Sequence, residues 1–298
     1  MAQGCAGAYM PPLFPPGARA KLPPMKTRLA IVHDWLNQWG GAEQVLEVLH
    51  EMYPQAPIYT SLFAPEAMPI AYRAWPIRTS FMQHLPLARR HHQPFLPLYP
   101  LAFRSFDLSD YDLVISVSSG FCHGVATGPG ACHINYCLTP PRFLWNLPQY
   151  LARERVDGVA RWLLPGLVAV LRRWDCSAVK GVQHFIGISR EVVARIQRTY
   201  GRPAALVYPP VNTHRFQPSA EIDDYFLVVS RLVPYKRVDL AVEAFSRLGL
   251  PLLVVGDGRD RPALEAIAAP NVRFLGRLPD EELPYLLSRC RAFRPAFP

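Results

Sequence analysis

The chain has 298 residues, of which 50% are hydrophobic and 18% charged, which is enough for one large domain or two ordinary ones. Its net charge of +9 favours a partner that carries negative charge, such as a phosphate compound, a nucleic acid or an acidic membrane surface. The longest strongly apolar stretch, residues 162–171, is ten residues long, which excludes a membrane-spanning helix because a span needs roughly 20 residues. The six cysteines form no CxxC pair and favour free thiols in a reducing compartment.

The N-terminal segment, residues 1–25, predicts a disordered, proline-rich tail. Six prolines occur among the first 24 residues, and aliphatic side chains are few, so the segment cannot bury enough surface to offset the entropy of ordering. It shows neither the basic start nor the apolar middle of a signal peptide, and we expect none. Regular structure is expected from Met25 onward.

From residue 29 the chain alternates short apolar runs, typical of buried strands, with stretches of helical spacing. In the first half, strands are expected at 29–33, 113–117, 133–137 and 185–188, and a helix at 43–52. In the second half, strands are expected at 226–230, 252–256 and 272–275, and helices at 239–248, 262–268 and 281–290. This alternation predicts an α/β protein with two Rossmann-like, doubly wound parallel sheets, the second with about three strands.

A proline-rich and polar stretch, VYPPVNTHRFQPSAEIDD, separates the two halves. Because such a composition disfavours regular structure, we place the domain boundary there. The N-terminal domain is expected at 26–215, and the C-terminal domain at 216–298.

Glycines follow two of the predicted strands, at the sheet edge where ligands bind in folds of this kind. Gly40 and Gly41 stand directly ahead of the first helix, and Gly256 and Gly258 lie at the end of the strand 252–256 and just after it. At such glycines the backbone can approach a phosphate or a sugar closely, because no Cβ intrudes. An ordinary tight turn remains the alternative for both.

Two cations, Arg231 and Lys236, occupy the turn that follows the strand 226–230. In a cleft between two nucleotide-binding sheets, a guanidinium and an ammonium would clamp a diphosphate. They would also stabilise the charge that develops on the diphosphate as it leaves, without a metal ion. Two solvated surface cations are the alternative that spacing alone leaves open.

Six motifs follow one another along the chain: GGAE at 40–43, YCLTPPRFLW at 136–145, YPPVNTHRF at 208–216, SRLVPYKRVD at 230–239, VVGDGRDRPALE at 254–265 and NVRFLGRLPDEEL at 271–283. In this order they resemble the retaining, nucleotide-sugar-dependent glycosyltransferases of the GT-B fold, in the glycosyl transferases group 1 that includes bacterial mannosyltransferases. The resemblance implies transfer of a sugar from GDP-mannose or a UDP-sugar to a glycan or lipid-linked acceptor, in the cytoplasm, as in polysaccharide biosynthesis. It further implies that Arg231 and Lys236 hold the donor diphosphate, that Gly40 and Gly41 face the sugar and phosphates, and that no cofactor is needed beside the nucleotide sugar.

The sequence departs from the family pattern in two places. Leu138 stands where many relatives have histidine, and leucine cannot form a hydrogen bond. Relatives continue past the LLSRCRAF helix into another strand and then a helix with two glutamates, whereas this sequence ends at CRAFRPAFP. We therefore expect a truncated second domain. The alternative function is an inactive remnant that acts at most as a binding module.

Other side-chain clusters have a structural and a functional interpretation. His123 and His133 either act near Leu138 or belong to the core, and their spacing from Cys122, Cys132 and Cys137 matches no closed zinc site. The arginines at 153, 155, 161, 172 and 173 flank the apolar stretch 162–171 and either contact an anionic membrane or form a solvated helix face.

Two further classes of function are disfavoured. The basic residues are scattered and form no stripe with interleaved aromatic side chains, which disfavours a nucleic-acid-binding protein. A sugar-nucleotide epimerase has a similar two-domain architecture, but the SRLVPYK and YPPVN stretches disfavour it.

Overall fold

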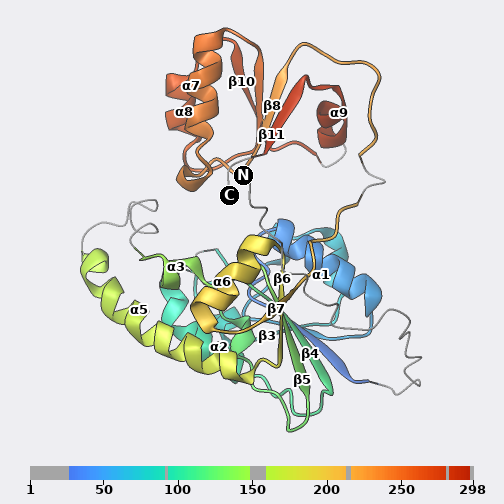
Figure 1. The fold of residues 1–298 in the computed structure, drawn as a ribbon, viewed down its shortest axis with the longest axis vertical. Helices are drawn as coiled ribbons and strands as arrows, with labels where there is room; N and C mark the ends of the chain where they lie inside the picture. The colour runs from blue at the N-terminus through green and yellow to red at the C-terminus, as the bar shows by residue number, and fades with distance from the viewer. Residues whose placement is uncertain (1–26, 91–92, 148–158, 213–215, 280–281, 296–298) are drawn as a thin grey trace, which may run out of the picture.

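The computed structural model of the protein describes residues 27–90, 93–147, 159–212, 216–279 and 282–295. Two parallel β-sheets follow each other along the chain, and Figure 1 shows them as two bodies, one above the other. The expected α/β architecture with two Rossmann-like sheets is therefore confirmed. The predicted tail, 1–25, lies outside the described residues.

The first sheet has seven strands in the order β3-β2-β1-β4-β5-β6-β7, and every neighbouring pair is parallel. The strands are β1 (Leu29–His33), β2 (Ile58–Thr60), β3 (Ile77–Thr79), β4 (Leu113–Ser118), β5 (Cys132–Cys137), β6 (His184–Gly187) and β7 (Ala204–Leu206). The four strands predicted for this half are present, with ends shifted by at most one residue. No apolar pattern predicts β2, β3 or β7, because each is only three residues long.

Helices connect these strands. The α-helices are α1 (Gly41–Met52), α2 (Tyr99–Arg104), α3 (Arg142–Trp145), α5 (Val159–Ala178) and α6 (Arg190–Tyr200). Short 3-10 helices lie at Pro65–Ala67 (η1), Ile70–Ala74 (η2), Phe81–His84 (η3), Gln93–Leu98 (η4), Cys122–Gly124 (η5) and Val179–Gly181 (η6). Both ends of α6 are capped by local residues. The Ser189 hydroxyl accepts a hydrogen bond from the Val192 amide, and Gly201, with a φ of 65°, ends the helix.

Alternate residues of β1 pack into two hydrophobic cores, one on each face of the sheet. Ala30 and Val32 belong to a cluster that includes residues of α2, α3 and α5, whereas Leu29 and Ile31 pack in a cluster with Leu46 of α1. Successive strand residues face opposite sides of a sheet, so β1 is buried on both. This is why residues 29–33 form an uninterrupted apolar run.

The second sheet has four parallel strands in the order β10-β9-β8-β11. They are β8 (Phe226–Val229), β9 (Leu252–Val255), β10 (Val272–Gly276) and β11 (Ala292–Pro295), connected by η7 (Pro234–Lys236), α7 (Val238–Leu248), α8 (Arg261–Ile267) and α9 (Glu282–Arg289). In Figure 1, α7 and α8 lie on one side of this sheet and α9 on the other. The three predicted strands and three predicted helices of this half are all present.

The prediction of about three strands for the second sheet is wrong, because β11 adds a fourth beside β8. The sequence AFRP has no run of β-branched residues, so its local pattern does not predict a strand. Tertiary contacts place it there. Arg289, at the end of α9, forms an ion pair with Asp223 at 2.8 Å, and the Arg291 amide donates to the Tyr225 carbonyl at 2.9 Å. These contacts align the following residues with β8.

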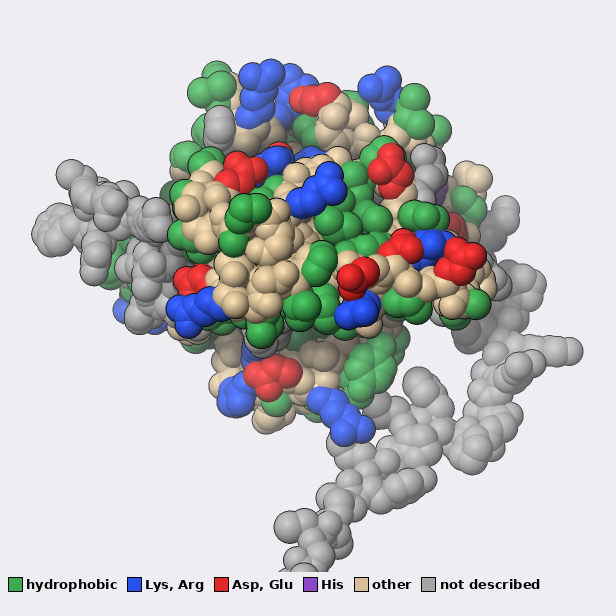
Figure 2. Space-filling model, turned by 90° about the horizontal axis from the view of Figure 1, so that it is seen from above, with side chains coloured by type: hydrophobic (Ala, Val, Ile, Leu, Met, Phe, Trp, Pro, Cys, Tyr) green, Lys and Arg blue, Asp and Glu red, His purple; other side chains and the backbone are tan. Residues whose placement is uncertain are grey.

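The segment between the sheets, 207–225, contains no helix or strand among its described residues. The exact domain boundary at 215/216 stays a prediction. Figure 2, which views the molecule from above Figure 1, shows Lys and Arg side chains interspersed with acidic and hydrophobic ones on this face. The positive net charge is therefore not gathered into one stripe on the part of the surface that this view describes.

Candidate functional site

The loops at the carboxyl ends of the first sheet meet the turn after β8 of the second sheet. Arg231, on this turn, donates from Nη1 to Oε1 of Gln38 at 3.4 Å. Gln38 lies in the loop between β1 and α1, two residues before Gly40. The predicted cation and the predicted glycine loop, almost 200 residues apart in sequence, therefore lie on facing sides of one junction.

Gly256 and Gly258 position the turn that carries Arg231. A Cβ at Gly256 would lie 1.8 Å from the Ser230 carbonyl oxygen, and a Cβ at Gly258 would lie 2.2 Å from that of Leu232. Gly256 also has a φ of 124°, which L side chains rarely adopt. The loop after β9 can therefore pack against the Arg231 turn only because both residues are glycine.

The backbone amides of these two glycines are used within the protein. The Gly256 amide donates to the Gly276 carbonyl at 2.7 Å, and the Gly258 amide donates to Oδ1 of Asp257 at 2.8 Å. The structure thus gives both glycines a packing role next to the Arg231 turn. Their contact with a ligand stays a prediction.

Gly40 and Gly41 are in a different situation. Gly40 is the N-cap of α1 and has an extended backbone, and its carbonyl accepts the first helical hydrogen bond from the Gln44 amide at 3.1 Å. A Cβ at Gly41 would meet no atom within 4 Å. Internal packing therefore does not require glycine at position 41, and contact of Gly40 and Gly41 with a ligand stays a prediction.

A buried side-chain hydrogen bond holds the start of α1 against β1. Nε2 of His33 lies 3.2 Å from Oε1 of Glu43, and both side chains are almost fully buried. Glu43 is the acidic residue of the GGAE motif. The motif therefore contains one glycine with free space beside it, Gly41, and one buried carboxylate that contacts β1. The sequence alone did not distinguish these two roles.

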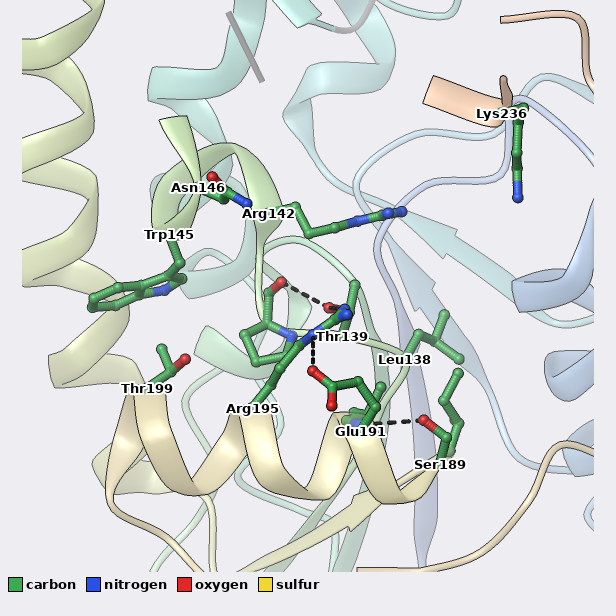
Figure 3. Close-up of a pocket in the computed structure, with 13 residues that line it drawn as sticks. Leu138, Thr139, Arg142, Trp145, Asn146, Ser189, Glu191, Arg195, Thr199 and Lys236 are labelled. Atoms are coloured by element: carbon green, nitrogen blue, oxygen red, sulfur yellow. Dashed lines mark hydrogen bonds and ion pairs between the residues drawn. The ribbon is translucent and has the colours of Figure 1, made fainter. Parts of the chain in front are cut away.

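Lys236 reaches a cavity of about 880 Å³ that is otherwise lined by the first domain. Its walls come from the loop after β5, from α3 and the residue after it, and from α6 with the two residues before it: Leu138, Thr139, Pro140, Arg142, Trp145, Asn146, Ile188, Ser189, Glu191, Val192, Arg195 and Thr199. Figure 3 shows Lys236 and Arg142 extending into the same space from opposite sides. The pKa of Lys236 is lowered, first by burial and then by the positive charges of Arg231 and Arg142.

Hydrogen bonds fix two walls of this cavity. Arg195 on α6 pairs with Glu191 at 3.2 Å and donates to the Thr139 hydroxyl at 3.4 Å. Beside the C-terminal end of α6, Nε1 of Trp145 donates to Oδ2 of the fully buried Asp175 at 2.8 Å. The cavity therefore has a preorganised shape, with an aromatic ring, hydroxyl groups and cations on its surface.

The sequence pattern does not predict a role for Arg142, Trp145 or Arg195. The first two lie in the motif YCLTPPRFLW, which was recognised only as a resemblance, and Arg195 looks like any exposed helical arginine in the sequence. Leu138, the departure from the family pattern, also lines the cavity. This wall of the candidate site is therefore apolar at position 138.

Asp34 was also missed. Its carboxylate accepts hydrogen bonds from four consecutive backbone amides, those of Ser119, Gly120, Phe121 and Cys122, at 2.7 to 2.8 Å. Asp34 follows β1 directly, and these amides follow β4, the neighbouring strand. One buried carboxylate thereby fixes the geometry of the loop edge next to the site.

His123 and His133 are core residues, as the structural interpretation expected. Nε2 of His123 lies 2.9 Å from Oδ1 of Asp175, and Nε2 of His133 lies 2.7 Å from the Ser116 hydroxyl. Neither histidine lines the cavity. Burial and, to a smaller extent, the charge of His123 lower the pKa of His133 to about 4. In the part of the chain that is described, no three His, Cys, Asp or Glu side chains are arranged to hold a metal ion.

Comparison with known proteins finds a match to a family model in the second half of the chain and solved structures with the same fold. No curated protein matches the sequence significantly, but residues 211–294 match the family model described as glycosyl transferases group 1. Among solved structures, Alr3699/HepE of Anabaena in complex with UDP and glucose is 14% identical, with a TM-score of 0.60, and the match covers 89% of this chain and 73% of that one.

Two further structures have the same fold. A variant of Os79 from O. sativa in complex with UDP is 12% identical with a TM-score of 0.53, covering 89% of this chain and 76% of that one. A glycosyltransferase from Rickettsia africae is 13% identical with a TM-score of 0.52, covering 90% and 73%. The two parallel sheets and these matches show that the chain has the GT-B fold, and residues 211–294 are similar to the glycosyl transferases group 1 family.

Proposed function

We propose that this protein transfers a sugar from a nucleoside diphosphate donor, GDP-mannose or a UDP-sugar, to a glycan or lipid-linked acceptor in the cytoplasm, with retention at the anomeric carbon. The observation that carries the proposal is the placement of Arg231 and Lys236 on one turn, between the glycine loop at the start of α1 and a cavity of the first domain. The complexes of Alr3699/HepE with UDP-glucose and with UDP support a nucleotide-sugar donor.

The two cations provide the chemistry. As the bond between sugar and diphosphate breaks, negative charge accumulates on the diphosphate oxygen. A guanidinium and an ammonium that are already in place stabilise this charge more than they stabilise the bound donor, which lowers the barrier. Arg231 is held by the hydrogen bond to Gln38, and Lys236 is partly withdrawn from solvent. We propose that they act without a metal ion and without a cofactor.

The acceptor is proposed to enter the cavity. A sugar ring presents apolar C–H faces and polar edges, and the cavity offers both kinds of partner. Trp145 provides an aromatic surface, and Thr139, Asn146 and Thr199 provide polar groups. Lys236 at one end would place the diphosphate beside an acceptor hydroxyl.

We also propose a peripheral contact with an anionic membrane through α5, which would bring a lipid-linked acceptor to the site. Val170 on this helix has 62% of its surface exposed, and Arg173 is exposed as well. Apolar and basic side chains together suit the surface of an anionic bilayer. No helix among the described residues is long and apolar enough to cross a membrane. Co-flotation with vesicles of anionic, but not of zwitterionic, lipid tests this contact.

The diphosphate clamp is tested by replacing each cation with alanine. Nucleoside diphosphate released from UDP-glucose and from GDP-mannose would be followed in the presence of a panel of glycans and lipid-linked sugars. Arg231→Ala and Lys236→Ala should each lower kcat by roughly 10²-fold or more. Arg104→Ala, which removes an exposed arginine of α2, serves as the matched control.

The outcomes separate the alternatives. If the folded Arg231→Ala and Lys236→Ala variants had wild-type kinetics, both residues would be solvated surface cations without a role in transfer. Binding of the nucleotide sugar without any transfer would favour an inactive binding module. An NMR spectrum of the product shows whether the anomeric configuration of the donor is retained.

A further inference from the structure

Arg142 brings a third positive charge to the junction, and this charge comes from the first domain. It is the first residue of α3, directly after the loop that follows β5. Its side chain extends into the space that Lys236 enters from the other side (Figure 3). Arg231 completes the group from the second domain, where it contacts Gln38.

The cavity is positively charged as a whole. Its described lining carries three cations, Arg142, Arg195 and Lys236, against one carboxylate, that of Glu191. This carboxylate lies 3.2 Å from Arg195 and 2.8 Å from Arg198, at the end where α6 forms the wall. The excess of charge therefore lies toward Arg142 and Lys236. Positive charges that lie close together repel each other, which disfavours the charged form of each group. An anion bound between Arg142 and Lys236 would be attracted by both and would offset this repulsion.

Arg142 is held on a rigid support. Within α3, the Leu144 and Trp145 amides donate to the Pro141 carbonyl at 3.0 and 3.1 Å. From α5, Nε of Arg172 donates to the Leu144 carbonyl at 2.6 Å, and Asp175 accepts the Trp145 indole hydrogen bond. A cation whose backbone is fixed in this way loses less entropy when it binds an anion than one on a mobile loop.

Building on the proposed function, we propose that Arg142 is a third cation for the donor diphosphate, so that the diphosphate is bound by both domains at once. In the transfer step, the bond between the anomeric carbon and the diphosphate oxygen breaks, and its electron pair stays on the diphosphate. The acceptor hydroxyl oxygen bonds to the anomeric carbon, and its proton passes to the diphosphate. Arg142 faces the oxygens that gain this charge from the side opposite Lys236.

Calorimetric titration of the full chain with UDP and GDP, and with uridine and guanosine, tests the proposal. Arg142→Ala should weaken binding of the diphosphate it prefers by about tenfold or more, the scale of a lost charge-assisted hydrogen bond. Binding of the nucleoside should not change, because the base and ribose do not contact Arg142. Arg142→Lys should recover part of the affinity, and Arg104→Ala should behave like wild type. Thermal unfolding of each variant verifies that it is folded.

Failure of this inference is distinct from failure of the proposed function. If Arg231→Ala weakens diphosphate binding but Arg142→Ala does not, the clamp stands and the role of Arg142 is refuted. An increase in KM for the acceptor with unchanged diphosphate affinity would also refute it, since Arg142 would then contact the acceptor. A wild-type chain that binds neither UDP nor GDP would overturn both proposals.

Discussion

Replacing Gly256 with alanine tests whether the loop after β9 positions the Arg231 turn. The new Cβ would lie 1.8 Å from the Ser230 carbonyl oxygen, whereas real Cβ contacts essentially never fall below 3.0 Å. One of the two backbones must therefore move by more than an ångström. The φ of 124° adds strain of about 1–3 kcal/mol, and forcing backbones apart in a packed region costs a further 1–3 kcal/mol or so. The free energy of unfolding should fall by about 2–6 kcal/mol, a large part of the 5–15 kcal/mol or so that is typical of a whole domain.

Gly249 is the matched control for this substitution. It also has a positive φ, 69°, but a Cβ there would meet no atom within 4 Å. Gly249→Ala should therefore cost only the left-handed conformation, about 1–2 kcal/mol. Urea denaturation of both variants measures the difference between them, which isolates the contact with Ser230.

The same pair of variants connects stability to the site. Ser230 precedes Arg231, so a displaced turn also displaces the guanidinium. Gly256→Ala should weaken binding of UDP or GDP at temperatures where it is still folded, and Gly249→Ala should not. The reasoning would be refuted if Gly256→Ala were no more destabilising than Gly249→Ala, or if its diphosphate affinity equalled that of the wild type.

Three other predictions follow from the site and its surroundings. Gly41→Ala should leave the free energy of unfolding unchanged or slightly higher, because the new Cβ contacts no atom. The same variant should weaken nucleotide-sugar binding in calorimetry. Unchanged binding would contradict a ligand at this loop. Because the pKa of His133 falls from 6.5 to about 4 on folding, the unfolded chain binds more protons between these values, so stability is lost as pH falls through this window, by about 3 kcal/mol. His133→Gln should remove this component from urea denaturation curves measured across the window, and an identical pH dependence in both proteins would argue against it. Sugar transfer should persist in EDTA, because cations stabilise the leaving group; a strict requirement for Mg²⁺ or Mn²⁺ in the release assay would point to a metal-dependent site.

Local sequence determines the central strands and the main helices of this protein. The runs at 29–33, 113–117 and 252–256 are long enough to show that a strand is buried on both faces, and α1 and α7 have a clear helical period. The turn between β8 and α7 could likewise be recognised as a candidate site, because its two cations lie in one short motif. Strands of three residues, such as β2, contain too few positions to show any period, and β11 depends on the docking of α9.

The composition of the site was decided by tertiary structure. Asp34 is at least 85 residues away in sequence from the four backbone amides that donate hydrogen bonds to it. Arg231 and Gln38 are separated by 193 residues. The contrast between Gly256 and Gly41 depends on what lies opposite each residue, a carbonyl oxygen in one case and open space in the other. The local sequence determines which backbone conformation a residue prefers. Which distant side chain it meets is set by how the sheets and helices pack, and that packing brings Arg142 and Lys236 to one cavity.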